Sequence, residues 1–337
     1  MAVDLGEVLS AATAYGDARE AEGRAAEREA VASELAALHT SLEESEAARA
    51  ELGGQLAALR AEYDAHMATH EPTPTPTRKV IGMSAPAAEW ATRLAEVGPT
   101  GVTARRIFCD LAKGADHRRP ETEQAIDAGM MPVLSFKVGG NITGAVAGSY
   151  DGVAEQVAAR LQAYDVPVAV TFWHEPNPDI TGAQFCNLHR RLLPIFRAER
   201  VFVGPLWNGW LLDNQVSTFA AYSAPDLLEA WDFAGMDIYA QGNKGQPSTW
   251  KLGPARGLPK LVAWLEAQGH ADKPILIGEY NGWTAEHIAQ MGEAVLSEPQ
   301  VWAALLFNSD NGDKGLVLTG DRLEAFRVTK ADPRAQQ

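Results

Sequence analysis

From Lys79 onward, short apolar runs alternate with amphipathic stretches, and this alternation constrains the fold more than any other feature of the chain. Alternating strands and helices produce a parallel sheet, and eight repeats close such a sheet into a (β/α)8 TIM barrel. The 259 residues from Lys79 to the end match the ~250 residues typical of this barrel. The eight runs are Lys79–Met83, Val102–Phe108, Met131–Phe136, Val168–Trp173, Val201–Leu206, Phe233–Tyr239, Pro274–Gly278 and Val301–Phe307.

The competing α/β architecture is an open doubly wound sheet, which usually has a glycine-rich turn after its first strand. Gly82-Met83-Ser84-Ala85-Pro86 is not such a turn. We therefore predict a barrel over residues 79–330 and a short C-terminal tail at 331–337. The amphipathic stretches between the runs include Ala87–Val97, Gly152–Tyr164, Gly182–Arg200, Arg256–Gln268 and Ala285–Leu296.

Residues 1–70 form a separate region of Ala, Glu, Arg and Leu without proline, a composition that favours helix. Apolar residues recur at spacings of four and three, the heptad pattern of helices that wind round a partner. Ser45, Arg49 and the Gly53-Gly54 pair interrupt the pattern, which fades before Val31. We predict an oligomerising coiled-coil stalk; the alternative is a solitary amphipathic helix lying on the barrel. The apolar positions are Val31, Leu35, Leu38, Leu42, Leu52, Leu56, Leu59 and Tyr63.

Alternating proline and threonine separate the two regions at residues 71–78. Proline cannot continue a helix, and such a repeat prefers extended, polyproline-like geometry. We interpret this segment as a semi-rigid spacer between a stalk and a head.

Charge and composition argue against several classes of function. The net charge is −15, and residues 1–71 hold 15 acidic against 5 basic side chains, so we expect no nucleic-acid partner. No apolar run reaches the roughly 18 residues that cross a membrane, and no secretory signal is visible. Cys109 and Cys186 are neither a disulfide framework nor a metal-ligand cluster, and we expect two buried thiols.

Two glutamates follow predicted strands, at the carboxyl ends where barrel enzymes place catalytic groups. The fourth run leads into Trp173-His174-Glu175-Pro176-Asn177, and the seventh into Gly278-Glu279-Tyr280-Asn281. Strands four and seven lie on opposite sides of a barrel mouth, so both carboxylates can face one cleft. Retaining glycosidases need two such carboxyl groups ~5 Å apart, one to donate a proton and one to attack the anomeric carbon.

The pair resembles the acid/base and nucleophile of clan A glycoside hydrolases, whose glutamates end strands four and seven. His174-Glu175 is similar to the mannanase-type family 26 of that clan, whereas other members more often have Asn before the acid/base. The order of the strands is similar over the whole of residues 79–330, and the similarity is specific in the two short motifs. It implies a double displacement with Glu175 as acid/base and Glu279 as nucleophile, and requires no cofactor or metal. The alternative is that either glutamate forms a structural salt bridge.

The resemblance also implies roles for neighbouring residues. Tyr239, which ends the sixth run, would hydrogen-bond the nucleophile; it could also be a rim tyrosine. Arg106 would support the nucleophile electrostatically, and strand alternation lets only one of Arg105 and Arg106 point inward. Asp237 would point the same way as Tyr239, deeper in the barrel. His174 would contact the sugar beside the scissile bond, or cap the barrel wall.

Aromatic residues at or past strand ends are candidate sugar platforms, because the apolar C–H face of a pyranose packs on a ring. Phe307 takes the place of the aromatic residue that the clan usually has on strand eight. Each aromatic residue could equally belong to the core. The predicted contacts are Trp173, Asn177, Trp207, Trp210, Trp283 and Phe307, with Asn208, Asn281, Asn308 and Asp310 as candidate hydroxyl partners.

The expected substrate is a β-linked polysaccharide, either mannan-like or a cell-surface glycan. A coiled-coil stalk, a Pro-Thr joint and a glycan-cleaving head without a signal peptide resemble a bacteriophage tail protein. This predicts a place in the virion, or release by a non-classical route. Two alternatives stay open: a degenerate barrel that binds glycan without cutting it, as an adhesin does, and a purely structural tail subunit.

Overall fold

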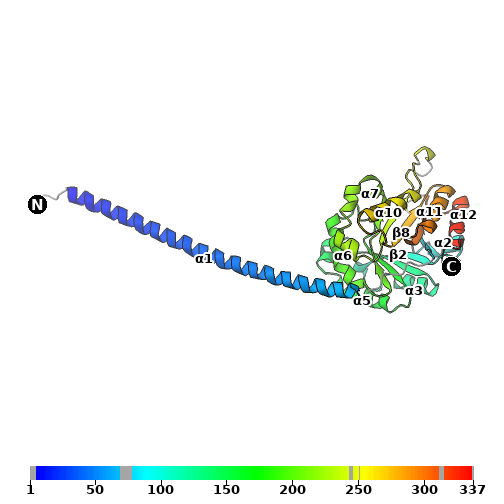
Figure 1. Cartoon of the computed structure of the whole chain (residues 1–337), viewed down its shortest axis with the longest axis horizontal. Coiled ribbons are helices and arrows are strands. Elements are labelled where there is room, and N and C mark those ends of the chain that lie inside the picture. The colour runs from blue at the N-terminus through cyan, green and yellow to red at the C-terminus, as the bar shows by residue number, and fades with distance from the viewer. Residues whose placement is uncertain (1–4, 69–77, 243–245, 250, 311–314, 336–337) are drawn as a thin grey trace. The chain divides into compact units, whose positions relative to one another are not determined.

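The computed structural model describes residues 5–68, 78–242, 246–249, 251–310 and 315–335 (Figure 1). The chain divides into two compact units, residues 1–72 and 73–337, and the boundary falls within the Pro/Thr segment. Most of that predicted spacer lies outside the described residues.

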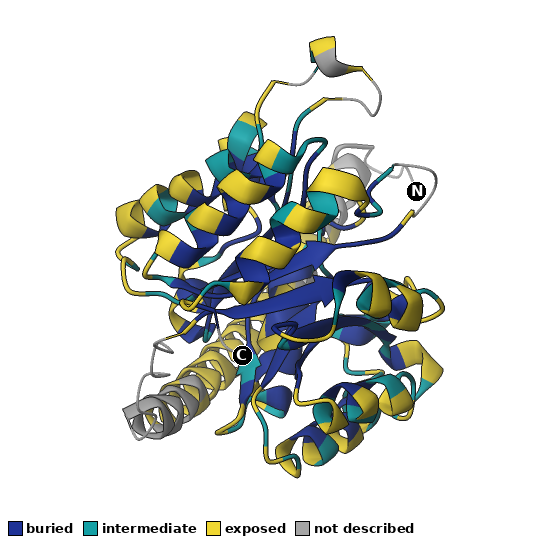
Figure 2. Ribbon diagram, turned by 90° about the vertical axis from the view of Figure 1, so that its right-hand side faces the viewer, coloured by how far each residue is buried: buried dark blue, intermediate teal, exposed yellow. Residues whose placement is uncertain are grey.

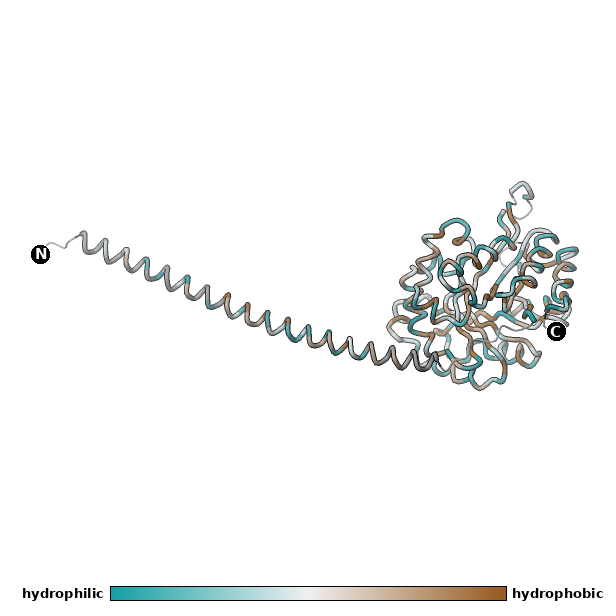
Figure 3. The backbone as a smooth tube through the Cα atoms, in the orientation of Figure 1, coloured by the Kyte–Doolittle hydropathy of each residue, from teal (hydrophilic) through white to brown (hydrophobic). Residues whose placement is uncertain are grey.

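The first unit is one helix, α1 (Leu5–Ala68), as the composition of residues 1–70 predicts. Its first described apolar positions, Val31, Leu35, Leu38 and Leu42, are all more than half exposed. In Figure 3, polar and apolar residues alternate along α1, whereas apolar residues gather in the centre of the second unit. No helix in the described part of the chain combines the length and apolarity needed to cross a lipid bilayer.

The second unit is built on one sheet of nine parallel strands in the order β5-β4-β3-β2-β1-β9-β8-β7-β6. Each predicted run contains a strand, and the fifth is divided in two. The strands are β1 (Val80–Ser84), β2 (Ala104–Asp110), β3 (Met131–Lys137), β4 (Val168–Phe172), β5 (Val201–Val203), β6 (Trp207–Asn208), β7 (Ala234–Tyr239), β8 (Ile275–Asn281) and β9 (Val301–Phe307).

The two end strands of this order, β5 and β6, are only three residues apart in the chain. Pro205 lies between them and has no N–H to donate to a neighbouring strand, which explains the interruption. The segment between β5 and β6 still bonds to the β4 side of the sheet: Gly204 N–H donates to Val170 O, and Glu175 N–H donates to Leu206 O. The sheet therefore curves until its ends meet, as in a TIM barrel.

Helices cover the outer face of the sheet, with buried faces toward the strands and exposed faces outward (Figure 2). All five predicted amphipathic stretches contain a helix. Several shorter helices were not predicted. The helices are α2 (Trp90–Val97), α3 (Arg119–Asp127), α4 (Ile142–Val146), α5 (Asp151–Gln162), α6 (Gly182–Phe196), α7 (Gly209–Asn214), α8 (Val216–Ala220), α9 (Pro225–Ala230), α10 (Gly257–Ala267), α11 (Ala285–Ser297) and α12 (Gly320–Ala331).

Apolar side chains fill the amino-terminal end of the barrel interior. Trp302, at the start of β9, packs edge-on against Phe202 with ring centroids 5.3 Å apart and lies 5.9 Å from Phe233. Smaller residues, such as Ala104 and Ala169, complete this inner cluster. With that end closed, polar side chains have room only at the carboxyl ends of the strands.

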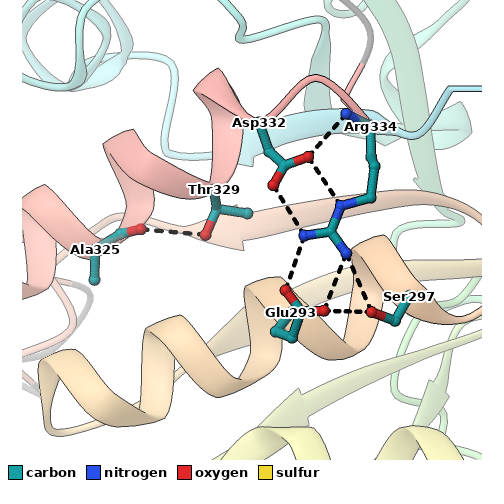
Figure 4. A network of polar contacts seen from close by, with 6 residues as sticks. All are labelled: Glu293, Ser297, Ala325, Thr329, Asp332 and Arg334. Atoms are coloured by element: carbon teal, nitrogen blue, oxygen red, sulfur yellow. Dashed lines mark hydrogen bonds and ion pairs between the residues drawn. The ribbon is translucent and has the colours of Figure 1, made fainter.

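The last described residues of the chain are attached to the barrel. Arg334 forms ion pairs with Glu293 of α11 and with Asp332 (Figure 4). Ala335 forms a bridge with Lys79, just before β1. The predicted tail at 331–337 is thus held against the first strand through its described residues.

Candidate active site

A cavity of about 900 Å³ opens at the carboxyl ends of the strands. Because parallel strands all end at one rim, residues far apart in sequence meet there. The cavity brings together eight of the predicted site residues: Arg106, His174, Glu175, Tyr239, Glu279, Asn281, Trp283 and Phe307.

Glu279 is buried on β8, and three side chains stabilise its carboxylate. Ser84 Oγ donates to Glu279 Oε1 at 3.0 Å, and Arg106 Nη1 lies 3.3 Å from the same oxygen. The hydroxyl of Tyr239 donates to Oε2. Donors directed at both oxygens stabilise a negative charge and fix the orientation of the carboxylate.

A β-bulge directs Glu279 into the barrel. In the pairing of β7 with β8, Met236 lies opposite Ile277 and Asp237 opposite Glu279, so Gly278 is an extra residue. A Cβ at Gly278 would lie 2.5 Å from Asp237 Oδ1 and 2.9 Å from Arg106 Nη1. Only glycine fits beside this ion pair, and the bulge reverses the side-chain alternation so that Glu279 faces inward.

Arg106 is fully buried and holds two carboxylates. Its Nη1 donates to Asp237 Oδ1 at 2.8 Å, and its Nε donates to Ser135 Oγ at 3.2 Å. Burial alone lowers the pKa of Arg106, but the charges of Asp237 and Glu279 outweigh it and raise the pKa above its ordinary value. Arg105 points the other way and stacks over the Trp90 ring, as strand alternation requires.

Asp237 shares this buried environment. Burial raises the pKa of Asp237 well above its ordinary value; Arg106 opposes the rise, and the charge of Glu279 adds to it. Two carboxylates, those of Asp237 and Glu279, thus lie against one guanidinium.

Tyr239 ends β7 and connects the nucleophile candidate to the aromatic wall. Its ring lies edge-on to Phe307, with centroids 6.2 Å apart. Burial, followed by the charges of Glu279 and Asp237, raises the pKa of Tyr239 well above its ordinary value. The phenol therefore keeps its proton and remains a hydrogen-bond donor.

Glu175 follows β4 on an unusual backbone. The φ angles of Trp173 and Glu175 are +58° and +47°, in the left-handed region that non-glycine residues rarely adopt. Two backbone hydrogen bonds fix this turn, from Trp173 N–H to Phe136 O and from Glu175 N–H to Leu206 O. A conformation that costs about 1–3 kcal/mol per residue persists only where the surroundings enforce it.

Trp173 supports this turn from behind the cavity. It is buried, and its indole N–H donates to Asp179 Oδ2 at 3.3 Å. Lys137 Nζ lies 2.9 Å from the same carboxylate and 4.9 Å from the centre of the Trp173 ring. The predicted role of Trp173 as a sugar platform does not fit this placement, because the ring is enclosed by protein.

His174 lines the cavity beside Glu175, with its ring 5.1 Å from that of Phe108. Its Nδ1 is buried and has no hydrogen-bond partner among the described residues. Burial, followed by the positive charges of Arg106 and Lys137, lowers the pKa of His174 well below its ordinary value. His174 therefore presents a neutral imidazole to the cavity.

Two predicted contacts lie away from the cavity. Trp207 is buried between the sheet and the helices, and its indole N–H donates to Tyr222 O at 3.0 Å. Asn177 accepts a hydrogen bond from Asn208 Nδ2 through its backbone oxygen, and its N–H donates to Asn208 Oδ1. This reciprocal pair joins the β4 loop to β6, and neither Trp207 nor Asn177 lines the cavity.

Sequence reasoning missed Ser84, whereas it named Asn281 and Trp283, which both line the cavity. Ser84 has no motif, and only its position at the end of β1 could have indicated it. Asn281 shapes the rim, since its Nδ2 donates to Leu316 O at 2.8 Å. Trp283 lines the cavity, and its buried indole N–H has no hydrogen-bond partner within the described ranges. No group of three or more His, Cys, Asp or Glu in the described part of the chain could hold a metal ion.

No protein-family model and no curated protein matches this chain in sequence. Solved structures of glycoside hydrolases share its fold. Thermotoga maritima Cel5A in complex with mannotriose has a TM-score of 0.53 at 13% identity, over 76% of this chain and 100% of that one. A Xanthomonas axonopodis endo-β-1,4-glucanase has a TM-score of 0.53 at 11% identity, over 75% and 99%. A Bacteroides ovatus GH5 xyloglucanase has a TM-score of 0.50 at 12% identity, over 76% and 68%. At such identities the likeness establishes a TIM-like barrel for the second unit.

Proposed function

We propose that the barrel is a retaining glycoside hydrolase with Glu279 as nucleophile and Glu175 as acid/base. The observation that supports this most is that two carboxylates line one cavity in different surroundings. Glu279 receives donors at both oxygens, from Arg106, Ser84 and Tyr239. Glu175 projects from a left-handed turn on another strand of the same cavity.

The proposed reaction is a double displacement. An oxygen of Glu279 attacks the anomeric carbon while Glu175 protonates the departing glycosidic oxygen, which leaves a glycosyl ester on Glu279. Glu175 then removes a proton from water, and the water oxygen attacks the same carbon and releases Glu279. Asp237 retains Arg106 in place while the charge of Glu279 is consumed in the ester, because both carboxylates contact the same guanidinium nitrogen.

The proposed substrate is a β-linked polysaccharide. The His174-Glu175 pair, similar to that of mannanase-type family 26, favours a β-mannan or a cell-surface glycan related to it. The barrel neighbours were crystallised with mannotriose and, for the xyloglucanase, with a XXXG heptasaccharide. These sugars are therefore the first to test.

We also propose that α1 pairs with α1 of further copies as a coiled coil and that the protein is part of a bacteriophage tail. The heptad positions of α1 that are more than half exposed support the pairing. The tail assignment is supported by the combination of a long helix, a Pro-Thr segment and a glycosidase-like barrel.

The deciding experiment measures new reducing ends released from β-mannans, β-glucans, xylans and bacterial cell-wall glycans. The proteins compared are the wild type, Glu175→Gln, Glu279→Gln and, as a matched control, Glu266→Gln on the exposed face of α10. We expect release by the wild type and the control, and a loss of several orders of magnitude in both site variants. NMR of the first-formed sugar should show the β-anomer. Binding without cleavage, unchanged in the site variants, would instead indicate a glycan-binding protein.

A further inference from the structure

A second cavity, of about 530 Å³, adjoins the first at the carboxyl ends of the strands. The two cavities share Glu175, Tyr239, Ala240 and Gly242. The second then continues over α7 and the segment between β7 and α10. Its further lining includes Trp210, Asp213, Asn214, Thr249, Lys251 and Arg256.

The two carboxylates are distributed unequally between these cavities. Glu279 lines only the first, whereas Glu175 lines both. In a double displacement the nucleophile must reach the anomeric carbon, so the sugar that forms the ester occupies the first cavity. The acid must reach the glycosidic oxygen, which departs with the other half of the substrate.

We propose that the second cavity binds the leaving half of the substrate, as a pyranose ring packed on Trp210. This inference rests on the proposed hydrolase function and adds a direction to it: the glycan chain crosses from the first cavity, past Glu175, into the second. Sugar would then occupy both sides of the scissile bond.

Trp210 is suited to this role because its ring is accessible while its helix is fixed. It is 53% exposed, whereas its neighbours Leu211 and Leu212 are buried. Asp213, one turn further along α7, pairs with Arg256 and with Lys260. The open indole face can therefore pack against the C–H face of a sugar with little loss of conformational freedom.

Hydrogen-bond donors stand at the edge of the same cavity. The Lys251 ammonium offers three N–H donors and has no ion-pair partner among the described residues. Asn214 adds an amide, one N–H of which donates to Trp210 O, and Thr249 adds a hydroxyl oxygen that can accept while its hydrogen is donated to Gln246 O. An aromatic face bordered by polar groups matches the two kinds of surface on a neutral pyranose.

The test compares two substrates that share the glycone. One is an oligosaccharide of the glycan that the wild type cleaves; the other is the glycosyl fluoride of the same glycone, whose leaving group places no sugar in the second cavity. For Trp210→Ala we expect kcat/KM on the oligosaccharide to fall about 10- to 100-fold, as when a packed aromatic anchor is truncated. On the fluoride it should stay within about twofold of the wild type.

Two controls separate the aromatic face from other effects. Trp210→Phe keeps a ring and should retain most of the oligosaccharide activity. Val216→Ala removes a similarly exposed apolar side chain on α8, which does not line the cavity, and should change neither substrate.

The inference is overturned if Trp210→Ala leaves oligosaccharide cleavage intact, or if it lowers activity on both substrates equally. A wild type that cleaves neither substrate would instead refute the proposed hydrolase function, and this inference with it. The two failures are therefore distinguishable.

Discussion

Arg106 Nη1 lies 3.3 Å from Glu279 Oε1, and both side chains are buried. The same nitrogen lies 2.8 Å from Asp237 Oδ1. One guanidinium thus pairs with two buried carboxylates, which makes it important for stability as well as for the chemistry.

Replacing Arg106 with Met should strongly destabilise the barrel. Without it, Asp237 and Glu279 remain buried without a counter-charge, and breaking a buried pair costs about 3–5 kcal/mol of unfolding free energy. Denaturant titration measures this loss. Arg190→Met is the matched control, because Arg190 pairs bidentately with Asp226 at the exposed surface, where such pairs contribute about 0–1 kcal/mol. Equal losses in the two variants would contradict the interpretation.

Tyr239→Phe removes one donor to Glu279 and keeps the ring. A hydrogen bond to a charged group contributes about 1.5–3 kcal/mol, so kcat should fall about 10- to 100-fold. Tyr280→Phe is the control: its buried hydroxyl has no hydrogen-bond partner in the described part of the chain, so its loss should leave kcat unchanged. Since burial and Glu279 raise the pKa of Tyr239 well above 10, ionisation of this tyrosine should cause no fall in activity up to about pH 10. A kcat in Tyr239→Phe equal to that of the wild type would contradict the assigned role.

Asp179→Ala should weaken the support of the turn that carries Glu175. Asp179 accepts from the Trp173 indole and from Lys137, and Trp173 and Glu175 both have left-handed φ angles. Small misplacement of a catalytic group can be costly, so we expect kcat to fall about 10-fold with KM nearly unchanged. The fall should be smaller for a substrate with an activated leaving group, which needs little help from an acid. An equal fall for both leaving groups would argue against a role through Glu175.

The strand positions could be predicted because parallel barrel strands are buried on both faces and therefore appear as apolar runs. The fifth strand was the exception, because one proline interrupts its ladder without changing its apolar character. Helices of five or six residues, such as α7 and α8, are too short to show a periodicity. The sequence named Trp210 as a candidate sugar platform, but it did not predict the short helix α7 that carries this residue.

The two glutamates could be predicted because each closely follows an apolar run that is recognisable as a strand. The bulge at Gly278 could not, because it arises from the close approach of Arg106 and Asp237. Trp173 and Trp207 show the limit of strand-end reasoning. Trp173 ends one predicted run and Trp207 follows another, and both are buried. A tryptophan at a strand end has the same sequence signature whether its ring faces solvent or the core.

Acid should destabilise the barrel through His189 on α6. Trp231 Nε1–H donates to His189 Nδ1, so the proton is on Nε2, which donates to Phe172 O. Burial lowers the pKa of His189 to about 3. In the unfolded chain, histidine has its ordinary pKa of about 6.5. Below that pH the unfolded chain gains a proton that the folded chain does not. This group's contribution to stability is therefore lost as pH falls from about 6.5 to 3, at about 1.4 kcal/mol per pH unit.

His189→Gln should remove this dependence of the unfolding free energy on pH, whatever its effect on stability at neutral pH. This dependence is the slope compared below. Urea titrations between pH 7 and 4 give the unfolding free energy of the variant, of the wild type and of His39→Gln, an exposed position on α1. The control should retain the slope of the wild type. The same slope in His189→Gln as in the wild type would contradict the assignment.

The heptad positions of α1 should hold several copies of the chain together. Leu38 and Leu42 are more than half exposed in the single chain, and burying a leucine contributes about 1.5–3 kcal/mol. Two or more helices that pack these positions together therefore have a substantial reason to associate. We expect the wild type to sediment as an oligomer and Leu38→Glu/Leu42→Glu as a monomer. Ala37→Glu/Thr40→Glu adds the same charge on another face of α1 and should remain oligomeric. Cleavage of a soluble oligosaccharide should be equal in all three, because the site lies wholly within the barrel unit. A wild type that sediments as a monomer would leave α1 a solitary helix and remove the assembly part of the proposal.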